Sequence, residues 1–123
     1  MTVRISKQFS FSASHQLADL PDHHQCSRLH GHNYTVEVEL GAPREALTGP
    51  GFVRDYGDLN GLKGWLDEWL DHRHLNDVLK DRSPTAENLA IWIFEEWIEI
   101  YPELTAVRIA ETQKTWAEYR PSA

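Results

Sequence analysis

Two segments in the first third of the chain alternate apolar and polar side chains, and this alternation constrains the fold more than any other feature of the sequence. One face of the first segment carries Phe9, Phe11, Ala13 and His15. One face of the second carries His30, His32, Tyr34, Val36, Val38 and Leu40. Because successive side chains of a strand point to opposite faces, each segment predicts a strand with one buried face. If the two strands pair over a common core, the histidines at their ends come within reach of one another.

These three histidines form a candidate metal site. His30 and His32 flank Gly31, so an extended backbone sends both imidazoles to one face with no bulk between them. His15 would join them from the first strand. Three neutral imidazoles around a divalent ion leave a fourth position open, which is typical of a catalytic zinc site. Each histidine alone is equally compatible with a solvated or hydrogen-bonded side chain, and only their convergence favours a metal.

Cys26 is the only cysteine and precedes His30 by four residues. A lone thiol is often a small buried hydrophobe, but the neighbours of Cys26 are polar, which favours a reactive thiol. These neighbours are Asp22, His23, His24, Gln25, Ser27 and Arg28.

Composition excludes several classes of protein. We expect one domain, residues 1–123, with 41% hydrophobic residues and five tryptophans arguing against disorder. The formal net charge of -7 and the lack of a basic cluster disfavour a partner that is nucleic acid or an acidic membrane surface. One cysteine, no secretory signal and no apolar run of about 18 residues favour a cytoplasmic protein.

The rest of the chain predicts two helices and two further strands. After a Gly- and Pro-rich connection at residues 41–51, a helical stripe follows Asp58: Leu59, Leu62, Leu66, Trp69 and Leu70. A second helix opens at Ser83-Pro84-Thr85, where either hydroxyl could cap it, and ends before Pro102. Its inward side chains are Leu89, Ile93, Phe94, Trp97, Ile98 and Tyr101. Strands at 107–111 and 116–119, joined by a turn at 113–114, complete an α+β order of β-β-α-α-β-β.

Two more positions carry chemistry. Asp71 stands beside His72, and a neighbouring carboxylate can fix the tautomer of an imidazole and raise its basicity. The same pair is also compatible with a charged helix carboxyl end. Glu111 continues the inward face of Val107 and Ile109, so it either forms an inward salt bridge or accepts paired N–H bonds from a guanidine-like ring edge, as in a pterin or guanine.

Together these residues resemble the 6-pyruvoyltetrahydropterin synthase family, most closely its bacterial 6-carboxy-5,6,7,8-tetrahydropterin synthases of queuosine biosynthesis. The matching motifs span nearly the whole chain: Phe9 to His15, Cys26-x3-His30-Gly31-His32, Gly51-Phe52-Val53-x-Asp55-Tyr56, Leu70-Asp71-His72-x2-Leu75-Asn76, Pro84-Thr85-x-Glu87-Asn88-Leu89 and Glu111-Thr112. The resemblance implies a Zn²⁺ cofactor, a group that transfers protons and a pterin anchor. It assigns zinc binding to His15, His30 and His32. It assigns proton transfer to Cys26, Asp71 and His72, and the pterin anchor to Glu111.

The resemblance also implies a tunnelling fold, in which a four-stranded antiparallel sheet carries two helices on one face. Trimers of this unit would close a barrel, and two trimers would stack into a homohexamer with active sites at the subunit interfaces. Closing the barrel would remove the exposed edges of the sheet.

The implied reaction converts 7,8-dihydroneopterin triphosphate to 6-carboxytetrahydropterin, acetaldehyde and triphosphate, which would make the chain a carbon–carbon lyase. The nearest alternative is 6-pyruvoyltetrahydropterin synthase proper, which only eliminates triphosphate. The three-residue gap between Cys26 and His30 resembles the bacterial pattern. An unrelated zinc hydrolase and a non-catalytic zinc- or pterin-binding protein also remain compatible with the sequence.

Overall fold

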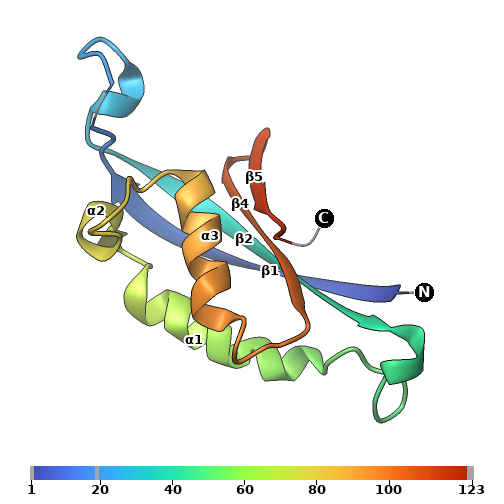
Figure 1. Ribbon diagram of the computed structural model, residues 1–123. Coiled ribbons are helices and arrows are strands. Elements are labelled where there is room, and N and C mark those ends of the chain that lie inside the picture. Colours follow the sequence, from blue (N-terminus) through green and yellow to red (C-terminus); the bar gives the residue numbers. More distant parts are fainter. Residues whose placement is uncertain (1, 19, 122–123) are drawn as a thin grey trace.

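Two long antiparallel strands form the frame of the protein. The computed structural model describes residues 2–18 and 20–121, and in it β1 (Thr2–His15) pairs with β2 (His30–Pro43) along their whole length (Figure 1). The register sets His15 opposite His30. Both strands confirm the predicted alternation. β1 begins seven residues before Phe9. The side chains of these seven residues are mostly exposed, so their sequence shows no apolar alternation that would predict a strand.

The sheet has five strands in the order β3-β1-β2-β4-β5. β4 (Leu104–Thr112) pairs with β2, and β5 (Thr115–Tyr119) pairs with β4, both antiparallel. The additional strand is β3 (Arg73–His74), which runs parallel to β1 at its edge. The four predicted antiparallel strands are therefore confirmed, and the prediction missed this short parallel strand. Two residues are too few to show a period, so only their backbone pairing with β1 reveals them.

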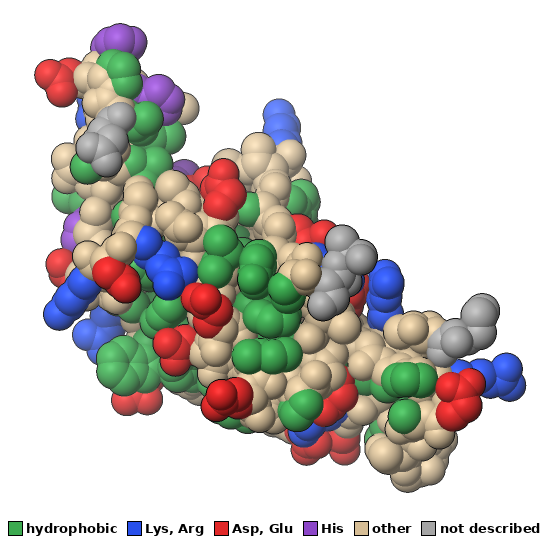
Figure 2. Space-filling view, in the orientation of Figure 1, with side chains coloured by type: hydrophobic (Ala, Val, Ile, Leu, Met, Phe, Trp, Pro, Cys, Tyr) green, Lys and Arg blue, Asp and Glu red, His purple; other side chains and the backbone are tan. Residues whose placement is uncertain are grey.

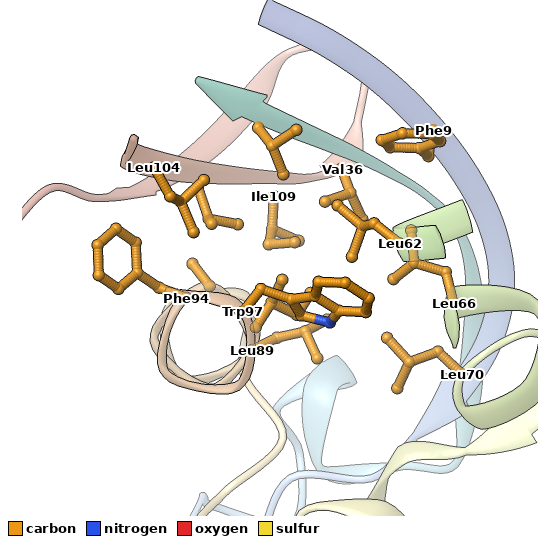
Figure 3. Close-up of a cluster of buried hydrophobic side chains, with 14 of the residues drawn as sticks. Phe9, Val36, Leu62, Leu66, Leu70, Leu89, Phe94, Trp97, Leu104 and Ile109 are labelled. Carbon is orange, nitrogen blue, oxygen red and sulfur yellow. The ribbon is translucent and has the colours of Figure 1, made fainter. Parts of the chain in front are cut away.

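The two main helices pack on one face of the sheet, as predicted. They are α1 (Asn60–Trp69) and α3 (Ala86–Trp97), with a single turn, α2 (Leu75–Val78), between them. Figure 3 shows side chains of both helices meeting those of the strands in one core. Trp69 was wrongly placed in that core, since 52% of its surface is exposed. The buried stripe steps directly from Leu66 to Leu70, which leaves Trp69 turned toward solvent.

The helix ends show which sequence signals were correct. Thr85 caps α3, because its hydroxyl accepts from the N–H of Asn88 at 3.1 Å. The helix ends at Trp97, before Pro102, so Tyr101 lies beyond it, although Tyr101 is buried as expected. Within residues 2–18 and 20–121, no helix is long and apolar enough to cross a membrane.

The opposite face of the sheet is charged. Arg108 of β4 pairs with Glu37 of β2 and with Glu118 of β5. Beside them, Arg120 holds Glu39 through two hydrogen bonds of 2.6 and 3.1 Å. The sheet is thus apolar where the helices cover it and ionic on its other side.

Candidate metal centre

Three histidines meet where β1 ends and β2 begins, on the helix-facing side of the sheet. The ring centroids of His15 and His30 are 4.5 Å apart, those of His15 and His32 5.1 Å, and those of His30 and His32 4.9 Å. One nitrogen from each ring lies within 4.8 Å of the other two, so the group could hold a metal ion. Figure 2 shows histidine side chains on the protruding loop between β1 and β2 and beside it. The strand pairing thus brings the three side chains together as the alternation predicted.

Backbone carbonyls set the orientation of two of the rings. His15 Nδ1 lies 2.7 Å from the carbonyl oxygen of Pro84, and His30 Nδ1 lies 2.6 Å from that of Arg28. A carbonyl oxygen can only accept, so each Nδ1 carries the proton and each neutral ring presents a lone pair on Nε2. The two Nε2 atoms are 2.9 Å apart. Two lone pairs at this distance repel each other unless a cation lies between them, so this donor set fits a divalent metal.

Burial favours the neutral, metal-binding form of His32. His15 is 1% exposed, and the hydroxyl of Tyr34 lies 3.3 Å from its Nδ1. Burial lowers the pKa of His32; the charge of Glu111 acts in the opposite direction, while His15 and His30 lower the pKa further. Burial also raises the pKa of Tyr34, and the negative charge of Glu111 adds to that effect, so Tyr34 stays a neutral phenol.

The carboxylate of Glu111, near the end of β4, points toward the histidine cluster. Its Oε2 lies 3.5 Å from His15 Nε2 and 3.4 Å from His32 Nε2, and 28% of its side chain is exposed. The inward direction predicted from the strand period is therefore correct. The carboxylate borders a cavity of about 170 Å³ together with Glu87 and Trp116.

Cys26 lies in the loop between β1 and β2, in a short 3₁₀ turn (Gln25–Ser27). The N–H of Cys26 donates to His24 Nδ1 at 3.0 Å, and its carbonyl accepts from the N–H of Leu17 at 3.1 Å. These bonds tie the loop beside the strand ends, and the thiol is half-buried. In the part of the chain that the structure describes, no hydrogen bond links the thiol to the three imidazoles.

Asp71 and His72 form the expected pair on the edge of β1. Asp71 Oδ1 accepts the N–H of Ser12 at 2.9 Å, and its Oδ2 lies 2.9 Å from His72 Nδ1. The hydrogen bond from Ser12 is the main reason why the pKa of Asp71 is lowered, and His72 adds to it. His72 has a backbone φ of 60°, which is unusual for a residue other than glycine. Its N–H donates to the carbonyl of Ser12 at 2.6 Å.

The imidazole of His72 points into solvent, with 84% of its side chain exposed. His72 and His32 both border a cavity of about 580 Å³. Among residues 2–18 and 20–121, however, no hydrogen bond or ion pair joins His72 to the three clustered histidines. A single chain therefore brings Glu111 together with the three histidines but leaves His72 outside this group.

Two supporting groups were missed by the sequence analysis. Tyr34 stands two residues after His32 on the same strand face, so its contact with His15 could have been inferred from that spacing. The carbonyl of Pro84 could not have been inferred, because a backbone acceptor carries no signal in the side-chain pattern.

Comparisons with known proteins agree with this architecture. The family model of 6-pyruvoyl tetrahydropterin synthase matches residues 4–122. A 6-carboxy-5,6,7,8-tetrahydropterin synthase of Synechocystis is 40% identical over 121 residues, covering 94% of this chain and 91% of the relative. A putative 6-carboxy-5,6,7,8-tetrahydropterin synthase of Archaeoglobus fulgidus is 38% identical over 112 residues, covering 90% of each chain. The structure of Caenorhabditis elegans 6-pyruvoyl tetrahydropterin synthase superposes with a TM-score of 0.84 at 30% identity, covering 99% of this chain and 97% of that one.

Proposed function

This chain belongs to the 6-pyruvoyl tetrahydropterin synthase family, and from that premise we propose that it is a zinc-dependent 6-carboxy-5,6,7,8-tetrahydropterin synthase. Its substrates are 7,8-dihydroneopterin triphosphate and one water molecule, and its products are 6-carboxytetrahydropterin, acetaldehyde and triphosphate. The observation that carries the proposal is the convergence of His15, His30 and His32 at the end of the sheet. The names of the two relatives at 38% and 40% identity and the short gap between Cys26 and His30 support this reaction over triphosphate elimination alone.

The three histidines are the proposed zinc ligands. The carbonyls of Pro84 and Arg28 hold two of the rings in the required tautomer, and burial keeps His15 free of competing water. Bound zinc supplies a Lewis acid that lowers the pKa of the side-chain hydroxyls of the substrate.

Cys26, His72 and Asp71 are the proposed proton-transfer residues. The thiolate of Cys26 moves protons at the carbon next to the pterin ring. Asp71 holds His72 Nδ1, so Nε2 is the nitrogen that exchanges a proton with the distal hydroxyl. Internal proton shifts reduce the ring and oxidise the side chain, so the reaction needs no nicotinamide.

Glu111 is the proposed anchor of the pterin. Its carboxylate accepts two parallel hydrogen bonds from the ring N–H and the 2-amino group. Its position at the same end of the sheet as the histidines supports this role, because a pterin held at its pyrimidine edge extends its C6 side chain away from the carboxylate, over a length that can reach the metal.

The active site is proposed to be completed by a neighbouring subunit. His72 is 84% exposed, and among the described residues no hydrogen bond or ion pair joins it to the histidine cluster, which supports a site shared between subunits. The assembly proposed from the family resemblance is a homohexamer, a dimer of trimers. The single half-buried cysteine is compatible with the reducing cytoplasm, where the queuosine pathway would use the product.

Product analysis tests the reaction. Purified, zinc-loaded protein is incubated with 7,8-dihydroneopterin triphosphate, and the products are identified by mass. We expect 6-carboxytetrahydropterin and equimolar acetaldehyde. A 6-pyruvoyl product without acetaldehyde would assign the chain to the alternative synthase, and loss of phosphate alone would assign it to the hydrolases. An unchanged substrate would favour a non-catalytic binding protein.

A further inference from the structure

We propose that Glu111 is the fourth ligand of the metal in the substrate-free protein, and that an arriving pterin ring withdraws it. This inference rests on the proposed function, since it concerns the same pterin and the same metal. It adds a second role for Glu111: the carboxylate that recognises the ring also covers the metal until the ring is present.

The distances at the site support Glu111 as a ligand. A tetrahedral zinc ion with bonds of about 2.0–2.2 Å to nitrogen and oxygen separates neighbouring ligand atoms by about 3.3–3.6 Å. Glu111 Oε2 lies 3.5 Å from His15 Nε2 and 3.4 Å from His32 Nε2. Both separations fall in this range, so one edge of the cluster already has the spacing of a metal-bound carboxylate. The 2.9 Å between the Nε2 atoms of His15 and His30 would have to open by a few tenths of an ångström.

The chemistry of the contacts points the same way. His15 Nε2 presents a lone pair, because its Nδ1 donates to Pro84, and Glu111 Oε2 presents another. Two acceptors facing each other in a largely buried site need a cation between them. A metal ion held by the three histidines meets that need for Glu111 as well.

Glu111 cannot bind the metal and also form both hydrogen bonds to the pterin ring. Paired hydrogen bonds to the N–H and amino groups of a pterin occupy both carboxylate oxygens. Binding the ring therefore removes Oε2 from the metal, and the hydroxyls on the side chain of the substrate are then the nearest replacement. Ring recognition would in this way open the metal only when a pterin is present.

The consequence is a measurable competition. A pterin without the hydroxylated side chain can take Glu111 but offers no hydroxyls in exchange, so zinc should weaken its binding. Couplings between two ligands are typically about 5–150-fold, and by reciprocity the pterin should weaken zinc binding by the same factor. If the ring instead bound the metal directly, zinc would strengthen pterin binding, so the sign separates the two arrangements.

The first experiment uses wild-type protein and unsubstituted pterin. Pterin affinity is measured by fluorescence titration with metal-free and with zinc-loaded protein. We expect at least about 5-fold weaker binding to the zinc-loaded form. Equal or tighter binding to the zinc-loaded form would overturn the proposal while leaving pterin binding, and with it the proposed function, intact. A failure of pterin to bind either form would contradict both.

The second experiment looks at the metal itself. Cobalt(II) replaces zinc, and its visible absorption reports the ligand set without any substrate. Glu111→Gln should change the cobalt spectrum, whereas Glu96→Gln, the same change at an exposed site on α3, should not. Adding pterin to the wild-type cobalt protein should shift its spectrum toward that of Glu111→Gln. Identical spectra for wild type and Glu111→Gln would exclude the carboxylate as a ligand, and Glu111→Asp repeats the test if the first variant does not fold.

Discussion

His15 shows how a single residue acquires a function from its neighbours. It ends a buried strand face, its Nδ1 donates to Pro84, and its Nε2 faces His30 at 2.9 Å. Alternation along β1 and β2 was enough to predict that the three histidines converge, because strand pairing fixes which side chains share a face. The exposed position of His72 was not predictable, since it depends on a left-handed backbone at a residue that is not glycine.

Metal content follows directly from the cluster. Purified protein should contain about one zinc per chain, and His30→Ala or His32→Ala should lose most of it. His24→Ala is the control, because His24 lies in the loop before β2 and accepts the N–H of Cys26. Zinc is measured by elemental analysis after dialysis against a weak chelator. Full zinc in a variant lacking all three clustered histidines would exclude this site.

Removal of the thiol should separate catalysis from binding. Cys26→Ala should retain zinc and pterin binding but lower turnover by a factor on the order of 100 or more, the usual contribution of a positioned acid–base group. Steady-state kinetics and pterin titration measure the two effects. An alkylating reagent should label Cys26 more slowly when a pterin fills the site. Wild-type turnover in the variant would mean that Cys26 is structural.

At the scale of elements, the amino end of α3 lies against the histidine cluster. Thr85 caps the helix, and the preceding residue, Pro84, supplies the carbonyl that orients His15. The sequence predicted this boundary from Ser83-Pro84-Thr85, but the choice between the two hydroxyls required the backbone geometry. β3 was missed for a similar reason: its two residues join the sheet through backbone pairing with β1, beside the turn in which Asp71 and His72 bind Ser12.

The two candidate caps give a matched pair of variants. Thr85→Ala should lower the free energy of unfolding by about 1 kcal/mol, because the N–H of Asn88 loses its acceptor. Ser83→Ala should change it by less than about 0.5 kcal/mol, as is usual for surface positions. Urea unfolding followed by circular dichroism measures both. Equal losses in the two variants would show that the cap assignment is wrong.

At the scale of the whole molecule, the sheet separates an apolar face from an ionic one. On the ionic face, the hydrogen bond from Arg120 lowers the pKa of Glu39 to about 2, and Thr105 contributes to the same effect. The ordinary value is 4.5, so the stabilisation is complete above pH 4.5 and is lost as the pH falls toward 2. A shift of this size corresponds to about 3 kcal/mol at a site that is 6% exposed.

Acid unfolding tests this ion pair. Glu39→Gln should lower the free energy of unfolding at pH 7 by up to about 3 kcal/mol and flatten its decrease between pH 4.5 and 2. Glu45→Gln, at an exposed position, should leave the pH profile unchanged. Denaturant titrations across this pH range provide the comparison. A wild-type slope in Glu39→Gln would show that other groups govern acid stability.

The proposed subunit assembly concerns the part of the site that one chain does not form. The strand and helix pattern predicted the fold. The proposed barrel, however, is built from several copies of the chain. The pattern of one sequence therefore cannot predict which residue of a neighbouring copy, such as His72, completes the site. If one subunit supplies Cys26 and its neighbour supplies His72, inactive Cys26→Ala and His72→Ala proteins should complement each other. After co-refolding in equal amounts, about a quarter of the sites should be intact. No recovered activity, with mixed hexamers verified by mass, would place both residues in one subunit's site.

Zinc titration coupled to product analysis tests the central claim most directly. Metal-free protein is given increasing zinc, and formation of 6-carboxytetrahydropterin from 7,8-dihydroneopterin triphosphate is followed at each step. We predict no product without metal, a linear rise, and saturation at about one zinc per chain, with no rise in the variant that lacks His15, His30 and His32. Full product formation by the metal-free protein, or by that variant, would contradict the account.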